Sequence, residues 1–458
     1  MRRSILIGAT ALCWLLLPSM ASAAEGADLL EQGRRSARAG ELASALQAFA
    51  AYKQQYPDDF RPYLYSGIEL AKAGRERDAA LELNDAASRG LEGGPEVVEY
   101  ARARIQLGDL REAARPLVEL EASGQLPAEG LWLLADIHYR LKQAPEAKQV
   151  LDKFARLQPN DPRLNLRRGQ VYIYLEQYEK ALTAIEEAVW AAPDSPERHF
   201  EMARTLYYGI NFEAAKTAAL KAVQLAPGNA EYLHLLGIIC DRLEQYDEAV
   251  KYLEQAAASP QAFNRIYFDL GNALRKAGER ERTREVLQKY RDLHNQSEEQ
   301  ANREKTIEAL VNQGRLQIQD GDIGAGRESL LRVLQLDPDH WLIHSLLTKI
   351  YLSSGRPDLA RPHVQKLVEI DPQSSEGHYL AGMYWYQKRD LAKALTHALK
   401  SKQLRPGDAE VHNLLGNIYF GQGQLEEAAE EYAAAVGLAP DRLDFQANHR
   451  TVERKLNP

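Results

Sequence analysis

The chain has few cysteines and few long apolar runs. It contains two cysteines, Cys13 and Cys240, in 458 residues. Cys13 lies in an N-terminal segment that we expect to be removed, which leaves one cysteine and no possibility of an internal disulfide. Stability must therefore come from packing. The long apolar run at the N-terminus is not repeated later, so the sequence predicts no membrane span in the mature chain.

The first 23 residues have the pattern of a secretory signal peptide. Arg2 and Arg3 precede an apolar run, Ile5 to Leu17, and Ala21-Ser22-Ala23 supplies small residues at a cleavage site. We predict cleavage after Ala23 and a periplasmic or secreted protein. The alternative is an uncleaved signal anchor, which would tether the same chain to the inner membrane.

Basic residues are outnumbered by acidic ones, and this limits the partners. The chain has 57 Lys and Arg against 65 Asp and Glu, a net charge of −8. Loss of Arg2 and Arg3 with the signal makes this more negative. An acidic surface gives no general electrostatic attraction to nucleic acid or anionic lipid, so we expect neither as a partner of the whole surface.

Patterns that would indicate catalysis or a bound metal are also lacking. The chain has no phosphate-binding glycine loop, and its glycines recur at regular places instead. His340 and His344 are four residues apart and could share a metal, but no HExxH-type carboxylate or cysteine pair stands nearby. We therefore expect no metal, no cofactor and no enzymatic activity.

A period of 34 residues dominates what is present. Small residues recur at position 8 of each period, and ten of twelve periods have alanine at position 20, with Thr283 and Gly326 as the exceptions. Proline recurs at position 32, where it ends a helix. The twelve periods begin at Gly26, Phe60, Gly94, Ala128, Pro162, Pro196, Ala230, Asn264, Ile307, Trp341, Ser375 and Ala409.

This pattern resembles the tetratricopeptide repeat (TPR), in which each 34-residue unit is a pair of antiparallel helices. The resemblance implies an all-α solenoid, a right-handed superhelix of about twelve helical hairpins. We expect the small residue at position 8 of the first helix to face the alanine at position 20 of the second. A hairpin cannot bury its own apolar face, so neighbouring repeats must stabilise one another.

The frame divides the chain into segments. After the signal, residues 1–23, it predicts an eight-repeat arm over residues 26–297 and a four-repeat arm over residues 307–442. Residues 298–306 form an insertion between the arms, and we expect it to lengthen a helix. Residues 443–458 follow as a capping helix or tail.

The repeat frame also explains residues that could suggest chemistry. Four histidines, His199, His344, His378 and His412, fall at position 4, a packing position. Cys240 falls at position 11, inside a hairpin, where a small buried side chain is expected rather than a nucleophile. We interpret all five as structural.

The resemblance implies that first helices line a concave groove, through positions 2, 5, 9, 12 and 13. Across the fourth to eighth repeats these positions are rich in aromatic and basic residues, which departs from the acidic composition of the whole. The predicted binding residues are Trp132, Tyr139, Arg140, Gln170, Tyr174, Phe200, Arg204, Tyr207, Tyr208, Arg242, Arg265, Phe268, Asn272, Arg275 and Lys276.

Two functions fit such a groove. The first is a protein-interaction scaffold of the cell envelope that binds an extended, acidic peptide or partner segment and supports an export, pilus or exopolysaccharide machinery. The second is a polysaccharide-binding module in which the aromatic side chains stack on sugar rings. A third reading is structural, in which the aromatics pack between adjacent first helices. The sequence does not identify the partner.

Overall fold

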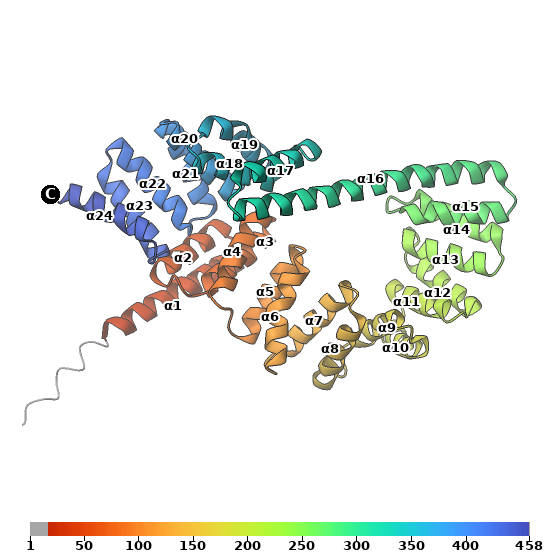
Figure 1. The fold of residues 1–458 in the computed structure, drawn as a ribbon. Helices are drawn as coiled ribbons and strands as arrows, with labels where there is room; N and C mark the ends of the chain where they lie inside the picture. The colour runs from red at the N-terminus through yellow and green to blue at the C-terminus, as the bar shows by residue number, and fades with distance from the viewer. Residues whose placement is uncertain (1–16, 458) are drawn as a thin grey trace, which may run out of the picture. The chain divides into compact units, whose positions relative to one another are not determined.

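The structure is a computed structural model that describes residues 17–457, with side chains from residue 28 on. Within this range the regular elements are 24 α-helices (Figure 1). The chain forms two compact units. Of the described residues, 17–113 and 307–457 form unit 1, and residues 114–306 form unit 2; the boundaries fall inside helices α6 and α16.

Unit 1 is built from the two ends of the described chain. Helices α2 and α23 pack against each other although most of the sequence separates them. The helices of this unit are α1 (Leu17–Arg38), α2 (Leu42–Gln55), α3 (Arg61–Lys72), α4 (Glu76–Ser88), α5 (Gly94–Gln106), the start of α6 (Leu110–Ala122), the end of α16 (Arg280–Gln319), α17 (Ile323–Leu336), α18 (Trp341–Ser353), α19 (Pro357–Ile370), α20 (Ser375–Gln387), α21 (Leu391–Leu404), α22 (Ala409–Gln422), α23 (Leu425–Leu438) and α24 (Leu443–Leu456).

Unit 2 is a run of helical hairpins in chain order (Figure 1). From α7 to α14 each first helix pairs with the helix that follows it, and that second helix packs on the first helix of the next hairpin. Besides the remaining parts of α6 and α16, its helices are α7 (Ala128–Arg140), α8 (Ala144–Leu157), α9 (Leu164–Tyr174), α10 (Tyr178–Ala191), α11 (Pro196–Tyr208), α12 (Phe212–Leu225), α13 (Ala230–Arg242), α14 (Tyr246–Ala258) and α15 (Asn264–Lys276).

The helices follow the predicted repeat frame. Eight of the twelve predicted repeat starts are the first residues of helices, namely of α5, α7, α11, α13, α15, α18, α20 and α22. The all-α solenoid architecture predicted from the 34-residue period is therefore confirmed.

The position-8 glycines are explained by a closer neighbour than the one expected. A Cβ atom added to Gly169 would lie 2.3 Å from Ile185 Cγ1, and one added to Gly237 would lie 2.5 Å from Leu253 Cγ. Both neighbours occupy position 24, whereas position 20 contributes only its carbonyl oxygen, 3.3 Å away at Ala181. Glycine at position 8 thus makes room for the large side chain one turn beyond the alanine.

Each hairpin turns through a residue in the left-handed backbone region. Position 15 has a φ between 58° and 90° in all twelve repeats. Seven of these residues are glycines, and the other five are Lys142, Glu176, Ile210, Glu244 and Arg389. The connection is therefore the same in every repeat, whichever residue occupies it.

The predicted insertion, residues 298–306, lies within the 40-residue helix α16. Residues 285–306 of this helix are largely exposed. At the C-terminus, α24 packs its buried Val452 against Ala428 and Tyr432 of α23. The proposed two-arm division and capping role stay predictions.

Most of the predicted signal peptide, residues 1–16, lies outside the described residues. The predicted cleavage site, Ala23, falls within α1, where the side chains are not described. Cleavage stays a prediction. Among the described residues, every helix is too short or too polar to cross a bilayer.

Candidate functional site

First helices of three successive repeats in unit 2, α11, α13 and α15, line a cavity of about 600 Å³ that is open to solvent on one side. It is lined mainly by polar and aromatic side chains. Eight of the fifteen residues predicted for the groove line it: Tyr207, Tyr208, Arg242, Arg265, Phe268, Asn272, Arg275 and Lys276. The other lining residues are His234, Ile238, Asp241, Leu253 and Asp269. We call this the α11–α15 cavity.

Side chains 35 residues apart contact each other across adjacent first helices of the cavity. Lys276 Nζ donates to both carboxylate oxygens of Asp241, at 2.6 and 2.8 Å. His234 Nε2 lies 2.8 Å from Asp269 Oδ2. A spacing of one repeat plus one residue places side chains opposite each other on neighbouring helices, so these contacts hold α13 and α15 in register.

Asp269 is a lining carboxylate that two side chains share. Burial alone would raise its pKa, but hydrogen bonds from His234 and Arg265 outweigh burial and hold the pKa below its ordinary value. Arg265 Nε donates to Asp269 Oδ2 at 3.0 Å. Asp269 is therefore a carboxylate at neutral pH, already shared by two partners.

The cavity lining carries more positive than negative charge. Four lining residues are Arg or Lys and two are Asp. Two of the cations hydrogen-bond to neutral partners: Arg242 Nε lies 3.4 Å from the Tyr207 hydroxyl, and Arg275 donates to Asn272 Oδ1 at 3.1 Å. Their guanidinium charges are thus available to a carboxylate from a ligand.

Aromatic rings supply the apolar part of the lining. Tyr207 and Tyr208 meet edge to face with ring centroids 5.5 Å apart, and Tyr208 also stacks on Tyr178 at 6.0 Å. Phe268 lies beneath the Arg265 guanidinium at 4.8 Å. Rigid rings beside arginines present apolar surface and charge together, as peptide-binding surfaces commonly do.

The remaining seven predicted residues lie toward α7, α9 and α11 and contact one another or neighbouring helices. Trp132 is covered by Arg163 at 4.5 Å, and Tyr139 meets Tyr174 edge to face at 5.4 Å. Arg140 forms an ion pair with Asp136 at 3.9 Å. The structure does not bring these residues into the α11–α15 cavity.

Gln170, Phe200 and Arg204 belong to the packing between repeats. Gln170 Nε2 donates to Glu201 Oε1 at 3.0 Å, and Arg204 lies 2.8 Å from the other carboxylate oxygen. Phe200 is buried against Tyr232, with ring centroids 4.8 Å apart. For these three, the geometry matches the structural reading more closely than the ligand-binding one.

The position-4 histidines contact the prolines that end the preceding repeats. His344 Nε2 lies 2.8 Å from the Pro338 carbonyl oxygen, so this nitrogen donates. In the neutral ring Nδ1 then accepts, from His363 Nδ1 at 2.9 Å. The same proline contact is made by His199, His378 and His412.

The described residues also offer no reactive cysteine and no metal site. Burial raises the pKa of the Cys240 thiol to about 11, which leaves it protonated and unreactive at neutral pH. In the part of the chain that the structure describes, no three His, Cys, Asp or Glu side chains are grouped to hold a metal ion.

The sequence frame missed Asp269, because position 6 is not one of the groove positions of the resemblance. A sequence signal for Asp269 does exist: it stands 35 residues after His234, and side chains with this spacing can pair across neighbouring first helices. The same spacing relates Asp241 to Lys276 and Tyr207 to Arg242.

Comparisons with known proteins identify the repeats independently. Four sequence families described as "Tetratricopeptide repeat" match the chain, and together they cover well over half of it. The matched residues are 99–162, 162–195, 200–263, 235–298, 317–384 and 409–442. No curated protein matches the sequence.

Two solved structures align with parts of the chain. A tetratricopeptide repeat protein from Parabacteroides merdae ATCC 43184 is 16% identical over 54% of this chain and 98% of its own, with a TM-score of 0.43. MamA from Desulfovibrio magneticus RS-1 is 24% identical over 36% of this chain and 93% of its own, with a TM-score of 0.34.

Proposed function

Because the chain belongs to the tetratricopeptide repeat family, we propose that it is a non-enzymatic scaffold that binds a partner protein in the α11–α15 cavity. Repeats of this kind generally bind other proteins. The ligand is an extended, acidic segment of that partner, which lies across the first helices of three successive repeats.

The observation that carries this proposal is the unequal charge of the cavity lining. Asp241 and Asp269 already pair with lining cations, whereas Arg242 and Arg275 hydrogen-bond to neutral groups. A carboxylate that enters the cavity gains two guanidinium partners. Tyr207, Tyr208 and Phe268 supply rings against which neighbouring side chains of the ligand pack.

We place the scaffold in the cell envelope, on the strength of the signal pattern in residues 1–23. The test is N-terminal sequencing of the protein recovered from its native host. An N-terminus at Ala24 supports export and cleavage. A chain that retains Met1 and sediments with membranes supports the uncleaved anchor instead.

Site-specific photo-cross-linking tests the binding site itself. The photo-reactive residue p-benzoylphenylalanine replaces Tyr208, whose side chain is 48% exposed at the cavity. A matched variant carries it in place of Trp190, an aromatic residue of α10 that is 86% exposed and does not line the cavity.

The proposal predicts that the Tyr208 position cross-links to an acidic segment of one defined protein and that the Trp190 position does not. Equal cross-linking from both positions would place the partner on another face. A cross-link to glycan, with no protein, would favour the polysaccharide-binding alternative.

A further inference from the structure

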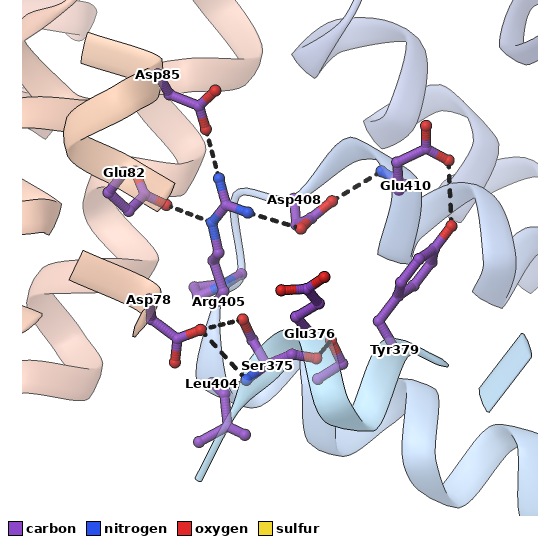
Figure 2. Close-up of polar contacts among 12 residues, drawn as sticks. Asp78, Glu82, Asp85, Ser375, Glu376, Tyr379, Leu404, Arg405, Asp408 and Glu410 are labelled. Carbon is purple, nitrogen blue, oxygen red and sulfur yellow. Dashed lines mark hydrogen bonds and ion pairs between the residues drawn. The ribbon is translucent and has the colours of Figure 1, made fainter. Parts of the chain in front are cut away.

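Unit 1 contains a polar contact between segments at opposite ends of the chain. Helix α4 presents three carboxylates, Asp78, Glu82 and Asp85, toward the C-terminal repeats (Figure 2). Their spacing of four and three residues places them on one face of the helix. We call the contact of α2 and α4 with the C-terminal repeats the clasp.

Arg405 is the central residue of the clasp. Its Nε donates to Glu82 Oε1 at 2.8 Å, and its other nitrogens reach Asp85 and Asp408 (Figure 2). Asp408 is in the same loop, three residues on. The planar guanidinium is thus divided among three carboxylates, two of which come from the N-terminal repeats.

A second cation is buried beside Arg405. Lys53 of α2 pairs with the other oxygen of Glu82, and the side chains of Lys53 and Glu82 are each only 2% exposed. Burial lowers the pKa of Lys53. Burial would raise the pKa of Glu82, but Lys53 and Arg405 outweigh it and hold the pKa below its ordinary value.

The start of helix α20 forms the other half of the contact. Asp78 Oδ1 accepts a hydrogen bond from the backbone N–H of Ser375 at 3.2 Å and another from its hydroxyl (Figure 2). The first amides of a helix have no partner within it, so α4 supplies an acceptor that α20 lacks. Arg77 pairs with Asp371 close by.

Two glycines allow the backbones to approach. A Cβ atom added to Gly407 would lie 2.9 Å from Lys53 Cδ, and one added to Gly437 would lie 3.1 Å from the Gln54 carbonyl oxygen. Gly407 therefore leaves the room that Lys53 occupies, whereas a Cβ atom at residue 437 requires a shift of only a few tenths of an ångström. The C-terminal repeats therefore contact α2 closely as well as α4.

Apolar packing contributes to each side separately. The cluster around Tyr63 and Leu83 draws its members from the N-terminal repeats, and the cluster around Val411 and Leu415 draws its members from the C-terminal repeats. The hydrogen bonds and ion pairs across the clasp join charged side chains to other charged or polar groups. Interfaces of this polar kind are typical of contacts that form and break.

We propose that the clasp is a reversible docking site. The C-terminal repeats carry a socket, formed by Arg405 and the first turn of α20, which recognises the acidic face of α4 in the same chain. The chain closes when that face docks and opens when it leaves. This proposal concerns unit 1 and does not depend on the function proposed for the α11–α15 cavity.

Disulfide trapping tests whether the clasp forms. The Cβ atom of Gln54 lies 3.5 Å from the position of a Cβ atom on residue 437. This is within the range of about 3.5–4.5 Å found in disulfides. The test protein carries Gln54→Cys and Gly437→Cys with Cys13→Ser, while Cys240 is buried.

The expected product is a cross-link within one chain, identified from the linked peptides by mass spectrometry. Arg405→Glu should slow cross-linking by more than about a hundredfold, because it faces Glu82 and Asp85 with a like charge. Lys400→Glu, on α21 outside the clasp, makes the same charge change and should leave the rate unchanged. Equal rates in both variants would refute the role of Arg405.

A charge exchange provides a second test that does not depend on the buried charges. Arg77→Asp alone should slow cross-linking, and adding Asp371→Arg should restore it. Failure of the double variant to recover would contradict docking by charge recognition. A cross-link between two chains would show that the contact is made between copies rather than within one.

Reversibility has its own readout. Gln54→Cys alone is labelled with a bulky maleimide under native conditions. A clasp that opens should allow labelling faster than the hydrogen exchange of buried amides in α2, and Arg405→Glu should accelerate it further. Labelling no faster than that exchange would show that the contact is permanent.

Discussion

Replacing Ile210 by glycine should stabilise the sixth repeat, although it removes a large apolar side chain. Ile210 occupies position 15, with a φ of 62°, and is 75% exposed. A left-handed conformation costs an ordinary residue about 1–2 kcal/mol, and β-branching adds to this. Part of this gain is offset, by about 0.5–1 kcal/mol, because glycine gives the unfolded chain more conformational entropy. The net expected stabilisation is about 0.5–1 kcal/mol.

Hydrogen exchange measures this locally, which suits a repeat chain in which unfolding need not be all-or-none. The amides of Asn211 and Ala215, which bond across and after the turn, should exchange about two- to fivefold more slowly in Ile210→Gly. The reverse change, Gly278→Ala, has open space for its Cβ and a φ of 86°. It should destabilise its repeat by about 1 kcal/mol. Faster exchange in Ile210→Gly would refute the reasoning.

Two further changes test the packing and the buried histidines. Gly169→Ala places a Cβ atom 2.3 Å from Ile185 and should cost about 1–3 kcal/mol by thermal unfolding. Gly228→Ala, which meets nothing within 4 Å, should be nearly neutral, and equal effects would contradict the packing account. Burial and His344 lower the pKa of His363 to about 4. The unfolded chain therefore binds more protons, so stability is complete above about pH 6.5 and falls toward pH 4, by up to about 1.4 kcal/mol per pH unit. His363→Gln should reduce that slope, and an unchanged slope would place the titration elsewhere.

The repeat frame made much of the fold predictable because each repeat must present the same shapes to its neighbours. Alanine at position 20 and proline at position 32 mark the hairpins directly. Position 15 was less visible, because Lys142 and Ile210 adopt the same backbone conformation as glycine elsewhere. At these positions the packing of the two helices of the hairpin determines the left-handed backbone conformation, whichever residue is present.

The site was predictable in part for the same reason. Groove positions identified Arg242, Phe268 and Lys276, since these face outward from first helices. They also selected Phe200, which is buried, because the frame does not record how closely adjacent first helices pack. Lining residues and packing residues can occupy the same position in different repeats.

The clasp could not be predicted from the sequence. Glu82 and Arg405 are separated by 323 residues, and neither departs from what an exposed repeat position tolerates. A periodic pattern reports contacts between neighbouring repeats. It carries no information on contacts between the first repeats and the last ones.

The central claim, that the α11–α15 cavity binds an acidic partner segment, is tested most directly by calorimetric titration of the segment captured at Tyr208. Arg242→Glu with Arg275→Glu should weaken binding by more than about tenfold, in line with loss of two charge-assisted contacts. Arg115→Glu with Lys180→Glu makes the same charge change on α6 and α10, outside the cavity lining, and should leave affinity within about twofold at 0.15 M salt. Equal affinity in both double variants would contradict the assignment of the cavity as the binding site.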